Sequence, residues 1–301
     1  MTFFLRFCIL KKNYCFSFYT KTKEQKIVAK NKKKKKKKKG GPLNVILTLG
    51  IIACVGVIAY SGYQLLSTRL AYHEGESEYG SLQRYTTETA SGAGEEDSEN
   101  REPAEAAVLE EETPPIQVDF ASLQAINPDI VGWLYMDALD ISYPIVQGTD
   151  NDYYLHRTFE GKDNFAGSIF VEYRNSGDFS DCNTIIYGHN MKNQTMFGKL
   201  DFLQNWEEYQ DGMYFWILTP EADYRYEIFN AQYTDAYSDV YTLFSDSGEL
   251  FLDYLNKMQS QSQIPLEERT FSESDRIVTL STCASSEGDE RYVVQGVRTE
   301  Q

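Results

Sequence analysis

The most continuous hydrophobic segment of this chain runs from Leu43 to about Leu66 and contains no charged residue. About 20 consecutive apolar residues are enough for a helix to cross the hydrocarbon core of a bilayer. The segment is also longer than the apolar part of a cleaved signal peptide, which is roughly 7–15 residues. The pattern therefore predicts an uncleaved transmembrane signal anchor over residues 42–66.

Beyond residue 116 the hydrophobic pattern changes to short apolar runs separated by turn-forming residues. Runs of this length and composition are typical of strands. We predict strands over Ser168–Glu172, Thr184–Tyr187, Met213–Leu218, Tyr224–Ala231, Arg276–Cys283 and Arg291–Arg298. A segment of about 185 residues is long enough to bury one good hydrophobic core. The sequence therefore predicts a single, mainly β domain over residues 117–301.

Two segments of this domain have apolar residues at helical spacing. Phe120, Leu123 and Ile126 share one face of a short helix that ends near Asn127-Pro128. A second helix before the late strands is indicated by Leu250, Phe251, Tyr254, Leu255 and Met258. Ser247 is its expected N-cap, because a serine side chain can accept a backbone N–H of the first turn.

The segment between the anchor and the β domain, residues 67–116, has a different composition. It contains thirteen acidic residues against three basic ones, has few large apolar residues and closes with Pro114-Pro115-Ile116. Such a segment cannot bury enough apolar surface to offset the entropy lost on folding. We therefore expect an acidic, disordered linker that holds the β domain off the membrane.

Charge is distributed unevenly along the chain. Residues 1–41 hold fifteen Lys or Arg, including the run Lys32–Lys39, against one acidic residue. The rest of the chain holds fourteen basic and forty-four acidic residues, and the whole carries a net charge of −16. Lysines that precede an apolar span keep the N-terminus in the cytoplasm and contact anionic lipid. We assign this segment to a cytoplasmic tail at a lipid bilayer and expect no nucleic-acid binding.

Three side chains with complementary chemistry lie at the ends of strand-like runs. Cys283 closes the run Thr279–Cys283, His189 stands in Tyr187-Gly188-His189-Asn190, and Arg291 follows the cysteine by eight residues. A Cys–His pair can transfer an acyl group through a thioester. A fixed cation beside the pair can stabilise the oxyanion that forms on the way. The sequence therefore predicts an acyl-transfer site.

The spacing alone brings Cys283 and Arg291 together. Residues 284–290 suit a loop, so the strand that ends at Cys283 and the strand that starts at Arg291 form a hairpin. Directly opposed Cβ atoms in such a pair are about 5 Å apart. Side chains alternate along a strand, so Thr279 and Cys283 share one face, which we expect to lie away from the core. No spacing rule places His189.

These segments, in this order, resemble the signature of the sortases, the cysteine transpeptidases of Gram-positive cell surfaces. The chain is also similar to class B members of that family over Phe120–Trp133, over Tyr143–Leu155 and over Gly167–Phe170. The resemblance covers roughly residues 117–299. It implies a closed β-barrel with one helix added at the N-terminus and another before the late strands.

The resemblance also implies roles for particular residues. Cys283 is the nucleophile that attacks the carbonyl of a threonine in a C-terminal sorting motif. His189 donates a proton to the departing amine, and Arg291 steadies the motif and the oxyanion. Three further residues are implied to contact the sorting peptide: Asn151, Leu155 and Ser281.

The implied partners are surface proteins with a C-terminal sorting signal, and an amine of a peptidoglycan precursor or a pilin that resolves the thioester. The catalytic domain is expected outside the plasma membrane of a Gram-positive bacterium. The chemistry needs no metal or organic cofactor, and no His/Cys cluster has the spacing of a zinc site. The motif stays open: Asn-Pro-X-Thr is usual for class B, with Leu-Pro-X-Thr and Ser-Pro-X-Thr as alternatives.

Other interpretations use the same residues differently. Of the five cysteines only Cys182 and Cys283 are expected outside, and a disulfide between them would consume the nucleophile. A Cys–His hydrolase of cell-wall peptides, or an L,D-transpeptidase, would use the same pair. The latter usually has a Ser-His-Gly-Cys segment, where this chain has Leu-Ser-Thr-Cys. A non-catalytic, anchored binding module would be favoured by loss of Cys, His or Arg, and all three are present.

Overall fold

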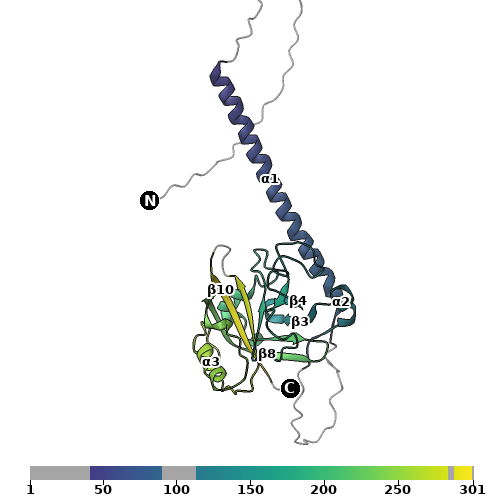
Figure 1. The fold of residues 1–301 in the computed structure, drawn as a ribbon, viewed down its shortest axis with the longest axis vertical. Coiled ribbons are helices and arrows are strands. Elements are labelled where there is room, and N and C mark those ends of the chain that lie inside the picture. The colour runs from purple at the N-terminus through teal and green to yellow at the C-terminus, as the bar shows by residue number, and fades with distance from the viewer. Residues whose placement is uncertain (1–40, 90–112, 284–287, 300–301) are drawn as a thin grey trace, which may run out of the picture. The chain divides into compact units, whose positions relative to one another are not determined.

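The computed structural model describes residues 41–89, 113–283 and 288–299. Apart from Gly41, the predicted cytoplasmic tail lies outside these residues. The α-helices are α1 (Pro42–Leu82), α2 (Phe120–Ile126) and α3 (Glu249–Ser260) (Figure 1). The strands are β1 (Thr86–Glu88), β2 (Ile116–Val118), β3 (Ile130–Met136), β4 (Ile141–Val146), β5 (Ile169–Val171), β6 (Asn183–Tyr187), β7 (Tyr214–Leu218), β8 (Asp223–Asp235), β9 (Ile277–Cys283) and β10 (Glu290–Arg298).

Eight of these strands close into a barrel in the order β10-β8-β7-β3-β4-β5-β6-β9, and β9 pairs with β10 to complete it. Neighbours are antiparallel except for two parallel pairs, β4 with β5 and β6 with β9. A parallel pair requires a long crossover connection. The connection between β4 and β5, residues 147–168, contains two of the predicted peptide-contacting residues.

The predicted closed barrel with added helices is confirmed.

The two predicted helices of the β domain are present. Helix α2 begins after Asp119, whose side chain accepts the backbone N–H of Ser122, and it buries Leu123. Helix α3 buries the apolar face that its spacing predicts. Ser247 is not its N-cap: the helix begins one residue later, because the carbonyl of Gly248 accepts the N–H of Leu252.

The core has two parts, one on each face of the β9–β10 hairpin. Inside the barrel, Leu280 and Val294 belong to a cluster that also contains the fully buried Leu134 and Phe215. On the opposite face, Val293 packs with the apolar residues of α3 in a second cluster. Each strand of the hairpin therefore has apolar contacts on both faces.

The second cluster corrects one expectation from the sequence. The face of β9 that carries Thr279 was expected to lie away from the core, but Thr279 and its cross-strand partner Gln295 are both fully buried. Their side chains bond to each other at 2.8 Å, and Gln295 also donates to Tyr254 of α3. This face is polar but covered, because α3 packs over it and supplies hydrogen-bond partners.

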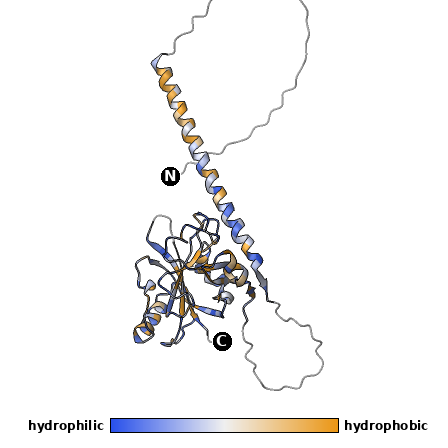
Figure 2. Cartoon of the chain, turned by 45° about the vertical axis from the view of Figure 1, so that its right-hand side comes forward, coloured by the Kyte–Doolittle hydropathy of each residue, from blue (hydrophilic) through white to orange (hydrophobic). Residues whose placement is uncertain are grey.

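The predicted linker also differs from the structure. Helix α1 continues to Leu82 instead of ending at residue 66, and its character changes along its length from hydrophobic to mostly hydrophilic (Figure 2). Tyr72, Tyr79 and Leu82 recur at helical spacing and pack with the core of the β domain. Strand β1 then pairs with β2. The net charge of the segment predicted disorder, but a helix that packs on a domain needs only one apolar face and can carry charges on the others.

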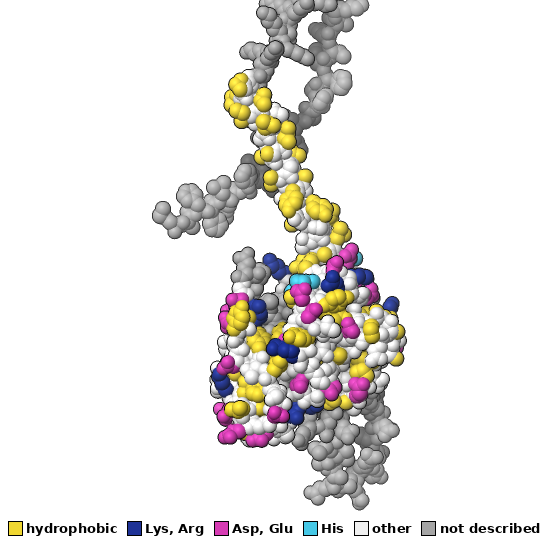
Figure 3. Space-filling view, viewed as in Figure 1, with side chains coloured by type: hydrophobic (Ala, Val, Ile, Leu, Met, Phe, Trp, Pro, Cys, Tyr) yellow, Lys and Arg dark blue, Asp and Glu magenta, His cyan; other side chains and the backbone are white. Residues whose placement is uncertain are grey.

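The remainder of the predicted linker, residues 90–112, lies outside the described residues. Within the described ranges, one helix is long and apolar enough to cross a membrane, judged by length and composition alone. The large apolar side chains of its first part, among them Leu43, Ile51 and Ile58, are exposed (Figure 3). Over the β domain, acidic and basic side chains are interspersed on the visible face.

Candidate active site

The parallel pairing of β6 with β9 places His189 near Cys283. Tyr187 is paired with Ser281, and the N–H of Gly188 donates to the carbonyl of Ser281 at 3.1 Å. Continuing this register by two residues sets His189 level with Cys283. Neighbouring strands are about 4.8 Å apart. A contact between segments almost a hundred residues apart in the sequence thus follows from a single strand pairing.

The antiparallel pairing of β9 with β10 places Arg291 on the other side. Cys283 and Arg291 are direct Cα partners, as the hairpin argument predicts. Since β9 lies between β6 and β10, Cys283 has Arg291 as its partner on one side, and the extension of β6 toward His189 runs along the other. The side chain of Cys283 is not among those that the structure describes. The position of its backbone follows from the pairing of strand β9.

His189 is half-buried, and its Nε2 lies 2.7 Å from the carbonyl oxygen of Leu155. A carbonyl can only accept a hydrogen bond, so Nε2 carries a proton and Nδ1 is the nitrogen left for proton exchange. Burial lowers the pKa of His189 below its usual range, the bond to Leu155 opposes that effect, and His156 adds to it. The imidazole is therefore oriented by the backbone and poised to exchange a proton.

Two glycines fix the surroundings of His189. A Cβ on Gly188 would lie 2.5 Å from Cδ1 of Ile169 and 2.7 Å from the ring of Phe197, so only glycine fits before the histidine. Gly167 has a φ of 58°, and a Cβ there would lie 2.6 Å from the carbonyl oxygen of Leu155. The chain is therefore tightly packed next to the histidine at Gly188, and the β4–β5 connection approaches the imidazole itself at Gly167.

Arg291 is partly buried at the start of β10. Its Nη1 donates to the carbonyls of Gly288 and Glu290, each at 3.0 Å. These bonds hold the guanidinium against the backbone of residues 288–290. The arrangement places a permanent cation at the strand pair that carries Cys283, where it could stabilise a thiolate or an oxyanion.

The three predicted peptide contacts lie in different environments. Leu155 is half-buried and supplies the carbonyl that holds His189. Ser281 is buried, and its hydroxyl lies 2.8 Å from that of Tyr241. The Asn151 amide accepts the N–H of Tyr173 at 3.0 Å and donates to Glu172 at 2.6 Å. The side chains of Ser281 and Asn151 thus already have partners within the protein.

Sequence reasoning missed Glu172, which follows β5 and is 1 % exposed. Besides Asn151, it accepts hydrogen bonds from Arg174 at 2.6 Å and from the Tyr187 hydroxyl at 3.1 Å. Burial by itself would raise the pKa of Glu172, but the bonds from Arg174 and Asn151 outweigh it and hold that pKa below its usual range. An acid at the end of the apolar run Ile169–Val171 was the only signal available in the sequence.

The alternative disulfide between Cys182 and Cys283 is excluded by the strand register. Cys182 precedes β6, and the next residue, Asn183, is paired with Ile277 at the start of β9. Cys283 is at the other end of that strand, about 20 Å away at 3.3 Å per residue. A disulfide requires Cα atoms within about 7 Å. Cys182 is a free, buried thiol, and burial raises its pKa.

Comparison with known proteins agrees with this geometry. The family model of the sortase domain matches residues 134–299. Sortase B of Listeria monocytogenes is 40% identical over 193 residues, which cover 60% of this chain and 74% of that protein. Sortase B of Staphylococcus aureus is 32% identical over 181 residues, with the same two coverages.

Solved structures give the same result. The crystal structure of sortase B from Bacillus anthracis in complex with AAEK1 superposes with a TM-score of 0.61 at 32% identity, covering 77% of this chain and 99% of the other. A Staphylococcus aureus sortase B–substrate complex superposes with a TM-score of 0.56 at 32% identity, covering 60% and 84%. The chain therefore belongs to the sortase family. Within that family it is a class B sortase, a cysteine transpeptidase.

Proposed function

We propose that this sortase is anchored in the membrane by α1, cleaves a C-terminal sorting motif after its threonine and transfers the acyl group to an amine. The observation that supports this most strongly is the position of Cys283 on β9, between His189 beyond β6 and Arg291 on β10. Nucleophile, proton donor and cation thus come from adjacent strand ends of one rigid barrel.

The proposed reaction has two acyl-transfer steps. The Cys283 thiolate attacks the threonine carbonyl carbon, and the tetrahedral oxyanion collapses as the peptide C–N bond breaks. Protonated His189 gives its Nδ1 proton to the departing amine, leaving a thioester on Cys283. The acceptor amine then attacks the thioester and forms the new amide. Its proton returns to Nδ1, and the thiolate is released.

Arg291 is proposed to orient the motif and stabilise the oxyanion. A planar guanidinium can hold two acceptors at once, whereas an ammonium group cannot do so with the same geometry. The backbone bonds made by Nη1 hold the group in position before substrate arrives. Preorganised donors of this kind stabilise developing charge without reorganisation during the reaction.

The proposed substrates are surface proteins with a C-terminal sorting signal, and Asn-Pro-X-Thr is the first motif to test. Asn151, Leu155 and Ser281 are proposed to contact the peptide, because they lie on the strand and the loop that hold Cys283 and His189. The proposed acceptor is an amine of a peptidoglycan precursor or of a pilin. The apolar part of α1 and the lysines before it support an anchor with its N-terminus in the cytoplasm.

The test is turnover by the full chain in detergent micelles. Quenched fluorescent peptides carrying Asn-Pro-X-Thr, Leu-Pro-X-Thr or Ser-Pro-X-Thr are mixed with an amine acceptor, and products are identified by mass spectrometry. We expect an amide-linked product from wild type and none from Cys283→Ala. Arg291→Lys should lose about 10²–10³ in rate if the guanidinium stabilises the oxyanion, and should approach wild type if the positive charge alone matters.

Each alternative gives a different outcome. Hydrolysis without amide product at any acceptor concentration would indicate a Cys–His hydrolase. Binding of peptide without turnover would indicate a binding module. Retention of activity by Cys283→Ala would show that the proposed mechanism is wrong.

A further inference from the structure

The end of α1 is fastened to the β4–β5 connection by buried hydrogen bonds. Tyr79 is 6 % exposed, and its hydroxyl donates to the carbonyl of Gly167 at 2.6 Å. The same hydroxyl lies 3.2 Å from the Ser168 hydroxyl and accepts the N–H of Phe159 at 3.3 Å. One tyrosine on the helix therefore ties together two distant points of this connection.

A second set of bonds fastens the same junction. Glu78 is buried beside Tyr79, accepts the N–H of Glu160 at 2.9 Å and pairs with Lys162 at 3.3 Å. Asn164, 7 % exposed, donates to the carbonyl of Ala71 at 2.9 Å. A buried polar group that lacks a partner is destabilising, so these bonds favour one position of the helix against the connection.

The connection that α1 holds is the one that orients the catalytic histidine. Gly167, whose carbonyl Tyr79 binds, packs so closely that a Cβ there would lie 2.6 Å from the Leu155 carbonyl oxygen and 3.1 Å from Cδ2 of His189. The Leu155 carbonyl in turn lies 2.7 Å from Nε2 of His189. Three successive contacts therefore lead from the Tyr79 hydroxyl to the imidazole.

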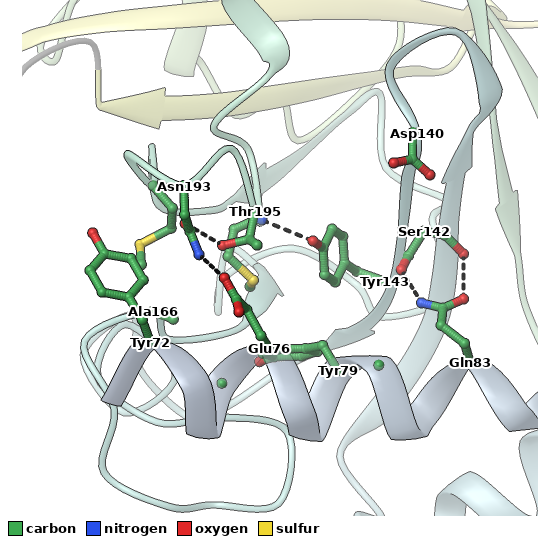
Figure 4. Close-up of a pocket in the computed structure, with 14 residues that line it drawn as sticks. Tyr72, Glu76, Tyr79, Gln83, Asp140, Ser142, Tyr143, Ala166, Asn193 and Thr195 are labelled. Atoms are coloured by element: carbon green, nitrogen blue, oxygen red, sulfur yellow. Dashed lines mark hydrogen bonds between the residues drawn. The ribbon is translucent and has the colours of Figure 1, made fainter. Parts of the chain in front are cut away.

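The helix also faces the loop that follows His189. A cavity of about 320 Å³ lies between the end of α1 and this loop, and its lining includes Tyr79, Tyr143 and Met196 (Figure 4). At its rim the Asn193 amide donates to Glu76 at 2.7 Å. Because the cavity leaves this side loosely packed, the buried bonds of Tyr79 provide the firm link between the helix and the histidine.

We infer that Tyr79 is a positioning residue for catalysis: through Gly167 and Leu155 it sets the orientation of His189, so that the helix proposed to anchor the enzyme also completes its active site. The inference rests on the proposed role of His189. It assigns to residues 71–83 a part in orienting the histidine, beyond serving as a spacer. Loosening the Tyr79–Gly167 bond should let the Leu155 carbonyl move away from the imidazole.

The test compares Tyr79→Phe with Tyr72→Phe in the full chain. Tyr72 lies on the same helix and packs its ring against Phe165, so the same hydroxyl is removed at a site outside the proposed path. The first measurement is the titration of His189 by NMR of histidine-labelled protein, with the signal assigned from its loss in His189→Asn. The second is kcat and KM for the peptide that wild type turns over fastest.

For Tyr79→Phe we expect a lower pKa of His189, because the carbonyl bond that favours the protonated imidazole is weakened. We also expect kcat to fall by about 10- to 10²-fold, the scale of a small misplacement of a catalytic group, with little change in KM. Tyr72→Phe should match wild type in both measurements. Asn164→Leu, which removes the side-chain donor to Ala71 without adding a charge, should move both in the direction of Tyr79→Phe and replaces it if that variant does not fold.

Two outcomes would overturn the inference: a folded Tyr79→Phe protein with wild-type titration and kcat, or equal losses in Tyr72→Phe. The NMR titration does not depend on turnover. If no peptide is cleaved by wild type, the proposed function fails, while the link between Tyr79 and His189 is still tested by the titration.

Discussion

At the scale of single residues, the site depends on backbone groups as much as on side chains. The Leu155 carbonyl selects the tautomer of His189, and the carbonyls of Gly288 and Glu290 hold Arg291. Every residue has a backbone carbonyl, so a hydrogen bond to a carbonyl does not require a particular residue type and cannot be recognised in a sequence motif. The histidine itself can be recognised in the sequence, whereas the group that orients it cannot.

His189→Asn tests the role of the imidazole directly. An asparagine cannot give up a proton near neutral pH, so turnover should fall by at least about 10²-fold, the scale of a lost general acid. Peptide cleavage by the full chain is the measurement, with the exposed His156 replaced by Asn as the matched control. Comparable turnover in both variants would assign His189 a structural role.

The same substitution should change the pH dependence of stability. Because the folded-state pKa of His189 is lowered, the unfolded chain binds a proton more readily than the folded one. The stability linked to the neutral imidazole is therefore present above the unfolded value of about 6.5 and is lost as pH falls below it. Urea unfolding between about pH 7.5 and 5.5 should show a shallower loss of stability in His189→Asn than in wild type.

At the scale of elements, the ends of β6 and β9 and the start of β10 carry the proposed catalytic residues, and close packing restrains the strands. Gly188 illustrates this packing, since its α-carbon faces Ile169 and Phe197 with no room for a methyl group. On the outer face of the hairpin, α3 covers the polar residues Thr279 and Gln295. Both contacts restrain the strands that carry the proposed catalytic residues.

Gly188→Ala should therefore destabilise the protein by about 1–3 kcal/mol, the usual cost of overpacking a core. The measurement is the free energy of unfolding in urea, together with peptide turnover. Gly80→Ala is the control, because a Cβ there meets nothing within 4 Å and alanine favours a helix. Equal stability of Gly188→Ala and wild type would show that the end of β6 has room for a methyl group.

At the scale of the whole molecule, a helix with an apolar, membrane-compatible first part is continuous with turns that pack on the barrel. The proposed anchor and the turns that pack on the β domain thus belong to one helix, which ends at Leu82. The rest of the predicted disordered linker, residues 90–112, lies outside the described residues. Their composition is acidic, with few large apolar side chains.

The proposed topology is tested with protease added outside intact Gram-positive cells. Cleavage within the acidic residues 90–112 should separate a fragment containing the β domain, visible on a denaturing gel. A tag placed before Lys32 should stay protected until the cells are opened. Recovery of uncleaved protein from the cytosol, without association with membranes, would contradict the anchor.

Local rules were sufficient for several features of this protein. Period-2 alternation and the length of one loop paired Cys283 with Arg291, because the two residues are close in the chain. Helical spacing found α2 and α3, and an uncharged apolar run found the candidate span. The ordered motifs identified the family, and with it the barrel.

Other features were decided only by the tertiary structure. The parallel pairing of β6 with β9 brings His189 level with Cys283, and no local rule selects which distant strands pair. Packing against the barrel orders α1 to Leu82, although net charge predicted disorder, because burial of one face outweighs composition. The Leu155 carbonyl and the Tyr79 hydroxyl meet their partners across long sequence separations, and such contacts exist only once the barrel has closed.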